Sequence, residues 1–295
     1  MATLVAPLGH VEAPEKLSLG GHLSIERTPL RVKRLIAEKL KKNEIRHPAD
    51  YSHCLVQRRS PCKDAVAGRQ VVQRLVILLR LFKAGGVFFN TVFHDKTGSL
   101  VSNLPLSRPP SVTAKTIHFF MAWSRQGAEL SYALSEEEAV ELAAFIKKYR
   151  DDGLLKLPPF LYFFRAYHEP YLGDRFLRNA VGLEGALVND QSDQSNIAFK
   201  FKERGASLLH LANPHEDGPD GYVKRLSAIY KARSDLVHGN RRMKSWKSEK
   251  AQRLLEDSEE FLRVILRTML AKPDLATSAG VDTFRRKAFA RGIAT

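Results

Sequence analysis

Cysteine is scarce in this sequence: its 295 residues contain only Cys54 and Cys62. The two lie eight positions apart, with neither a Cys-x2-Cys spacing nor a second ligand pair. Two free thiols are therefore a better interpretation than a metal site with the nearby His47 and His53. The chain also lacks the glycine-rich loops of nucleotide-binding proteins and the His-Glu-x-x-His motif of zinc proteases. We therefore expect neither a cofactor nor a metal.

Long hydrophobic runs are absent as well. The longest, Leu-Val-Ile-Leu-Leu at residues 75–79, is far too short to cross a bilayer. The first residues, Met-Ala-Thr-Leu-Val-Ala-Pro, lack the basic start and continuous apolar core of a secretory signal. We therefore expect no membrane partner and a cytoplasmic location.

Acidic residues are fewer than basic ones. The sequence has 32 Asp and Glu against 47 Lys and Arg, which gives a formal net charge of +15. Such an excess favours polyanionic partners through counterion release, although charge alone does not say which polyanion. Hydrophobic content of 44% is otherwise typical of globular proteins, and the length suits two domains.

The first half of the chain has mixed patterns. Residues 1–28, with their Gly, Pro and His, predict an irregular entry segment. Residues 30–40 have apolar positions at helical spacing and predict a short basic amphipathic helix. Residues 70–82 repeat an apolar period near 3.6 and predict a helix that ends before Gly85 and Gly86.

Strand patterns follow this helix. Residues 87–94 are aromatic and β-branched and predict a strand, followed by a turn at 95–98. Residues 99–112, with three prolines, predict a loop, and residues 113–123 predict another strand. Residues 29–155 are therefore interpreted as a mixed α/β domain of unknown role.

A capping box marks the last helix of this half. Ser135 precedes a helical pattern and Glu138 stands three positions later, which satisfies two amide donors reciprocally. Asp151, Asp152 and Gly153 end the pattern. We place the domain boundary in the connection formed by residues 151–159.

The second half carries only helical patterns. Residues 158–272 predict an all-α bundle, so the fold class is α+β overall with an all-helical C-terminal domain. Residues 160–167 and 175–188 predict one broken or two short helices, and residues 197–211, 222–238 and 249–270 predict three more. Residues 273–295 are basic and weakly patterned and predict an exposed arm, either solvated or in contact with RNA.

Arg233 falls among the apolar positions of the helix predicted at 222–238, on a stripe with Leu226, Ile229, Tyr230, Leu236 and Val237. A core-facing arginine is costly to desolvate unless an anion or an interface reaches it. His238 follows at the flank of the stripe, and the next residues, Gly239 and Asn240, are a helix stop signal.

A histidine at a helix C-terminus and a nearby guanidinium together suit phosphate chemistry. The helix dipole favours an imidazolium there, and the imidazole can act as acid or base. The guanidinium can bind a phosphodiester and stabilise its transition state. Taken separately, however, an interface arginine and a capping histidine also account for Arg233 and His238.

The segment Tyr230-Lys-Ala-Arg233-Ser234-Asp-Leu-Val-His238-Gly resembles the R-x4-6-H signature of the HEPN superfamily, and in particular its Apea-like group. Residues 174–187, from Asp-Arg-Phe-Leu-Arg-Asn-Ala to Glu-Gly-Ala-Leu, are similar to the first long helix of that group. Residues 201–209, Phe-Lys-Glu-Arg-Gly-Ala-Ser-Leu-Leu, are similar to its second. The resemblance covers residues 158–272.

This resemblance implies a homodimeric helical bundle whose paired motifs form one cleft, and a nuclease that cuts RNA without metal. His238 would be the acid or base and Arg233 the phosphate clamp. Glu184 and Arg204 match recurrent polar positions and would either orient the pair or form a structural ion pair. Ser234 departs from the Asn, Asp or His that often follows the arginine in catalytic members.

A basic segment follows the motif and contains Arg241, Arg242, Lys244, Trp246 and Lys247. It predicts either a rim that contacts the RNA backbone, with the indole stacked on an unpaired base, or a solvated loop whose tryptophan anchors it to the bundle.

Two functions follow from these observations. One is a metal-independent endoribonuclease in a defence or toxin role that leaves a 2′,3′-cyclic phosphate and a 5′-hydroxyl. The alternative is a non-catalytic HEPN-like module that binds RNA or protein or senses a ligand.

Overall fold

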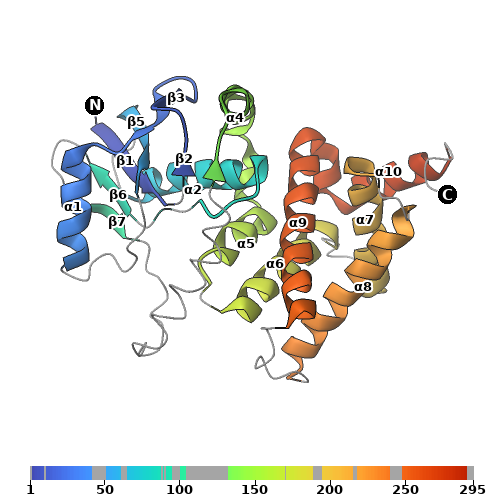
Figure 1. Ribbon diagram of the computed structural model, residues 1–295. Helices are drawn as coiled ribbons and strands as arrows, with labels where there is room; N and C mark the ends of the chain where they lie inside the picture. The colour runs from blue at the N-terminus through green and yellow to red at the C-terminus, as the bar shows by residue number, and fades with distance from the viewer. Residues whose placement is uncertain are drawn as a thin grey trace. The chain divides into compact units, whose positions relative to one another are not determined.

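The computed structural model divides the chain into two units, Met1–Asp151 and Asp152–Thr295 (Figure 1). Their division lies within the connection predicted at 151–159. The fold is α+β, mostly helical with a small antiparallel sheet. The structure describes residues 2–9, 11–41, 51–60, 65–87, 89, 91–94, 100–103, 132–169, 171–188, 195–214, 218–239 and 248–290.

A six-stranded sheet organises the N-terminal unit, in the order β3-β4-β5-β1-β6-β7, with each described neighbour pair antiparallel. A short parallel pair, β2 with β8, stands beside it. The strands are β1 Ala2–Leu8, β2 Val11–Glu12, β3 Lys16–Ser18, β4 Leu23–Arg27, β5 His53–Ser60, β6 Thr91–His94, β7 Leu100–Asn103 and β8 Tyr132–Ala133.

The prediction that residues 1–28 are irregular is wrong, because β1 to β4 lie there. β1, β2 and β4 pair with β5, β6 and β8, which come later in the chain, so their local pattern is weak; β3 pairs with its neighbour β4. Pro7 of β1 also weakens the strand pattern, because proline is rare inside sheets. It lies opposite Cys54 of β5, whereas β6 pairs only with Leu4 and Val5 among the described residues. The proline is therefore tolerated, as at a sheet edge.

The other strand predictions are partly confirmed. β6 occupies only the second half of the predicted strand 87–94. The loop predicted at 99–112 is wrong for residues 100–103, which form β7 on the edge of the sheet. The turn at 95–98 and the strand at 113–123 lie outside the described residues.

Helix α1, Leu30–Lys41, confirms the predicted amphipathic helix and covers one face of the sheet. Its Val32 and Ile36 pack with Val5, Cys54 and Val56. Cys54 is buried and is not part of a disulfide. The other cysteine, Cys62, and the histidine at position 47 lie outside the described residues.

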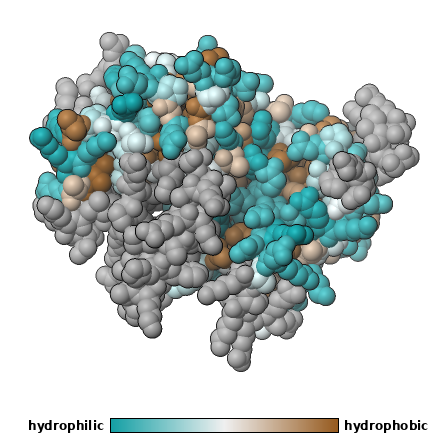
Figure 2. All heavy atoms as spheres, in the orientation of Figure 1, coloured by the Kyte–Doolittle hydropathy of each residue, from teal (hydrophilic) through white to brown (hydrophobic). Residues whose placement is uncertain are grey.

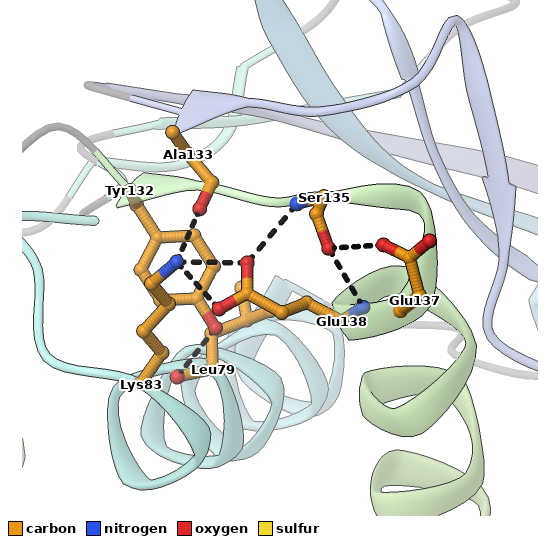
Figure 3. A network of polar contacts seen from close by, with 7 residues as sticks. All are labelled: Leu79, Lys83, Tyr132, Ala133, Ser135, Glu137 and Glu138. Carbon is orange, nitrogen blue, oxygen red and sulfur yellow. Dashed lines mark hydrogen bonds and ion pairs between the residues drawn. The ribbon is translucent and has the colours of Figure 1, made fainter.

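Helices α2, Ala65–Phe82, and α4, Glu136–Tyr149, confirm two further predictions. A polar network joins their ends (Figure 3). The Lys83 ammonium donates to the Ala133 carbonyl at 2.7 Å and to both Glu138 oxygens at 2.7 and 2.8 Å. The Tyr132 hydroxyl donates to the Leu79 carbonyl at 2.7 Å.

The predicted capping box is present at the start of α4. The Ser135 hydroxyl accepts from the Glu138 amide at 3.2 Å, and the Glu138 carboxylate accepts from the Ser135 amide at 3.0 Å. The hydrogen bond from Lys83 lowers the pKa of Glu138, because it stabilises the ionised carboxylate. One carboxylate thus caps α4 and ties it to the end of α2.

The second unit is helical throughout its described residues, which confirms that part of the prediction. Its elements are η2 Gly153–Lys156, α5 Pro158–Ala166, α6 Leu172–Leu187, α7 Ile197–Ala212, α8 Gly218–Val237, α9 Glu249–Ala271, η4 Pro273–Ala276 and α10 Ser278–Ala290. Aromatic and aliphatic side chains from α5, α6, α7, α8 and α9 fill the core, among them Phe163, Phe176, Phe201, Leu226 and Phe261.

Two glycines let these helices approach closely. A Cβ on Gly182 of α6 would lie 2.7 Å from a Leu262 methyl of α9. A Cβ on Gly205 of α7 would lie 2.8 Å from a Leu226 methyl of α8. Neither distance leaves room for a side chain, so these glycines set the spacing of the bundle.

The prediction of an exposed arm at 273–295 is wrong for residues 273–290, which form η4 and α10. Val281 of α10 is fully buried, and Arg285 pairs with Glu203 of α7 at 3.2 Å. Arg285, one of the residues that gave the tail its basic appearance, thus faces a carboxylate of the bundle, a pairing that local sequence does not reveal.

None of the helices in the described part of the chain is both long and apolar enough to cross a membrane. The face shown in Figure 2 is mostly hydrophilic where residues are described, with hydrophobic atoms in small patches. The exposed large hydrophobic residues are Leu30, Val140, Tyr171, Phe199 and Val237.

Candidate functional site

The C-terminus of α8 places His238 at the end of a helix, as predicted. The His238 amide donates to the Ser234 carbonyl at 3.0 Å, and the Gly239 amide donates to the Leu236 carbonyl at 3.3 Å. Gly239 has φ +70°, a left-handed conformation that glycine adopts without strain and that ends helices. His238 itself is exposed to solvent.

Arg233 lies one turn earlier and is held by α6. Its Nη2 forms an ion pair with Glu184 Oε2 at 2.8 Å, with side-chain exposures of 24% and 26%. Its Nε is buried and has no hydrogen-bond partner among the described residues. Since a guanidinium carries five N–H donors, Arg233 is anchored by Glu184 and still has a donor to satisfy.

The predicted apolar stripe of α8 is correct only in part. Leu226 and Ile229 are fully buried, but Val237, the last residue of α8, is 51% exposed. Arg233 and His238 are five residues apart, which on an α-helix means about 140° of rotation and about 7.5 Å of rise. Arg233 therefore faces α6, while His238 projects in another direction at the helix end.

The supporting positions Tyr230 and Ser234 lie on the same helix. The Tyr230 ring contacts the Phe201 ring of α7, with centroids 5.5 Å apart. Ser234 is half-buried and its carbonyl accepts the hydrogen bond from the His238 amide. Tyr230 thus contributes to the packing of α8 on α7, and Ser234 to the last turn of α8.

Arg204 lies on α7 and binds residues of α10 and α6. Its side chain is 3% exposed, and its Nε and Nη2 donate to the two oxygens of Asp282 at 2.8 and 2.6 Å. Its Nη1 donates to the Leu187 carbonyl at 2.9 Å. The structure therefore gives Arg204 a place in the bundle that connects α7 with α6 and α10.

The predicted RNA-contacting residues Arg241, Arg242, Lys244, Trp246 and Lys247 lie outside the described residues. Among the described residues, no group of three or more His, Cys, Asp or Glu side chains is placed to hold a metal ion. Arg233 offers a cation that can bind an anion, and His238 offers an imidazole that can transfer a proton.

Comparisons with protein-family models, with curated proteins and with solved structures found no match for this chain.

Sequence reasoning missed two features. Asp282 is the partner of Arg204 across 78 positions, and no local pattern announces such a pair. The second feature is a cavity in the N-terminal unit bordered by Arg58, Arg74 and Arg150. Its arginines come from separate segments, so only folding brings them together.

Proposed function

We propose that the helical unit is a HEPN-like domain and that the protein is a metal-independent endoribonuclease with a defence or toxin role. The observation that carries this proposal is the end of α8. There an anchored arginine and a solvent-exposed histidine stand five residues apart in a motif that resembles R-x4-H. The formal net charge of +15 favours a polyanionic substrate.

In this mechanism Arg233 and His238 divide the work. The guanidinium donates hydrogen bonds to the phosphate oxygens and stabilises the charge that develops there. The ribose 2′-oxygen forms a bond to the phosphorus while the bond to the 5′-oxygen breaks. Imidazole takes the proton from the 2′-hydroxyl, and imidazolium gives a proton to the leaving 5′-oxygen. The products are a 2′,3′-cyclic phosphate and a 5′-hydroxyl.

A homodimer completes this proposal. Because Arg233 and His238 project about 140° apart on one helix, a composite site needs the histidine of one copy near the arginine of the other. The exposed Val237, at 51%, lies next to His238 and offers apolar surface for such a contact. The dimer is thus the arrangement in which the two groups meet one phosphate.

The experiment is RNA cleavage by the full-length protein in chelator, with end-group analysis of the fragments. We expect wild type to leave cyclic phosphate ends and His238→Ala to lose activity at least about a hundredfold, as for removal of an acid or base. His210→Ala is the matched control, because His210 also lies in the last turn of a helix of this unit. It is expected to retain activity.

Arg233→Ala is expected to lose cleavage and also to weaken RNA binding, since it removes the phosphate contact. Its control is Arg178→Ala, which removes another half-exposed, ion-paired arginine of the same unit. Failure of wild type to cut any RNA while a control ribonuclease does, or equal activity of wild type and His238→Ala, would end the nuclease proposal.

A second candidate, a non-catalytic HEPN-like module that binds RNA or protein, is favoured by the Arg233–Glu184 ion pair. That pair gives Arg233 a structural partner in the absence of any ligand. On this alternative, wild type and His238→Ala bind RNA equally and neither cuts it. Glu184→Gln discriminates further, because a purely structural pair predicts loss of stability without any effect on RNA affinity.

A further inference from the structure

The N-terminal unit contains a cavity of about 350 Å³ that the proposed function does not use. It lies where the turn between β3 and β4, strand β5, the middle of α2 and the end of α4 meet. This volume is at the lower end of the range found for small-molecule sites. All of its lining belongs to one unit.

Two of the three arginines at this cavity have carboxylate partners. Arg58 binds both oxygens of Glu26 at 2.7 Å. Arg150 Nε donates to Asp151 at 3.3 Å, and Asp151 is 87% exposed, so that pair is strongly screened. Asp151 is the one carboxylate among the lining residues.

Arg74 is the exception. Its Nε donates to the Gln70 carbonyl at 3.4 Å, and no carboxylate pairs with it among the residues that the structure describes. It lies half-buried on α2, where a cation costs desolvation that an anion would offset. The cavity therefore presents one uncompensated guanidinium and a second, weakly paired one.

The β3–β4 turn fixes the second guanidinium. Gly20 and Gly21 have φ +88° and +62°, and Arg150 Nη1 donates to the Gly20 carbonyl at 3.0 Å. A Cβ on Gly21 would stand 3.3 Å from that nitrogen. The glycine turn thus allows Arg150 to lie close against the backbone, with its position set before any ligand arrives.

The rest of the wall is apolar. Leu23 and Leu75 are buried and Val71 is half-buried at the cavity. A ligand that fits both parts has an anionic head and an apolar or half-apolar body. Phosphate suits the head better than carboxylate, because its tetrahedral oxygens can meet guanidiniums that come from two different helices.

We propose that this cavity binds a small organic phosphate. The phosphate contacts Arg74 and Arg150, and the organic part packs against Leu23, Val71 and Leu75. A half-enclosed space of this volume holds one small molecule and not a run of nucleotides, which distinguishes it from an RNA-binding surface.

The test is calorimetric titration of the full-length protein with phenyl phosphate and with inorganic phosphate at constant ionic strength. We expect saturable binding of phenyl phosphate, tighter than that of inorganic phosphate because the ring adds apolar contact. Arg74→Met is expected to weaken phenyl phosphate at least about tenfold, the usual effect of losing hydrogen bonds to a charged group. Arg34→Met is the control, since it removes an exposed arginine from α1, away from the cavity.

Val71→Phe provides a second variant that leaves the charges unchanged and fills the apolar wall. It is expected to abolish phenyl phosphate binding while inorganic phosphate still binds. No saturable binding by wild type overturns the proposal, and so does equal weakening by Arg74→Met and Arg34→Met, which indicates non-specific charge attraction. Binding of an RNA oligonucleotide that requires Arg74, without binding of phenyl phosphate, also overturns it. None of these measurements depends on RNA cleavage.

Discussion

The ion pair between Arg204 and Asp282 provides a direct test of how the C-terminal helix is attached. We consider Asp282→Asn, which keeps the size of the side chain and removes its charge. Arg204 would then remain 3% exposed, with one neutral acceptor in place of a bidentate carboxylate and with its bond to the Leu187 carbonyl.

The expected cost follows from burial. Removing one partner of a buried pair costs about 3–5 kcal/mol, because the other charge is left uncompensated. Asp282 is 41% exposed, so solvent already screens part of its attraction to Arg204. We therefore expect Asp282→Asn to lose about 2 kcal/mol of stability. Because Asp282 lies on α10, this loss should appear first as local opening of that helix.

Hydrogen exchange of the backbone amides, followed by mass spectrometry, measures the local opening of α10 directly. We expect exchange in peptides of α10 to rise about thirtyfold, the factor that corresponds to about 2 kcal/mol. Asp274→Asn is the control, since it removes an exposed carboxylate from the neighbouring η4. If both variants leave α10 equally protected, the pair does not attach this helix and the reasoning is refuted.

Three further predictions concern the packing and the caps, with stability measured by chemical denaturation unless stated otherwise. Gly205→Ala should lower the free energy of unfolding by about 1–3 kcal/mol, because its new methyl group overpacks the core. Gly153→Ala should lower it little, because nothing lies within 4 Å of the added Cβ. Equal losses of stability in the two variants would contradict the packing argument. Ser135→Ala should lower the free energy of unfolding by about 1 kcal/mol, because α4 loses its N-terminal cap. An unchanged denaturation midpoint would contradict this prediction. In thermal melts across pH, Lys83→Met should lower Tm most at neutral pH. The pKa of Glu138 is lower in the folded protein than in the unfolded chain, so its ionised carboxylate stabilises the fold above about pH 4.5. This stabilisation is lost as the pH falls and the carboxylate is protonated, so the effect of Lys83→Met on Tm should shrink below about pH 4.5. A difference in Tm that does not depend on pH would contradict this.

Much of the fold follows from local patterns. Amphipathic periodicity predicted α1, α2 and the helices α5 to α9 of the second unit, because burial of one face imposes a period near 3.6 on the sequence itself. The capping box at Ser135 and the stop at Gly239 were predicted as well, since both depend on residues within a few positions. The stop signal at Gly239 was also enough to predict that His238 lies at the end of a helix.

Long-range pairing decided the rest. Strands β1 and β4 depend on β5 and β6 for their pairing, and β2 depends on β8. Such partners lie outside residues 1–28, so the strands leave little trace in the local sequence. The partners Glu184 for Arg233 and Asp282 for Arg204 also lie far away in the chain. The arginines around the N-terminal cavity likewise come from β5, α2 and the end of α4.

The sequence by itself thus determined most of the helices, the cap of α4 and the charged residues that α8 presents. Only the tertiary structure decided which carboxylate meets which arginine, and that the chain after residue 273 is a docked helix. The physical reason is that helical hydrogen bonds join residues four apart, whereas strand pairing and buried ion pairs join residues whose separation the chain does not encode locally.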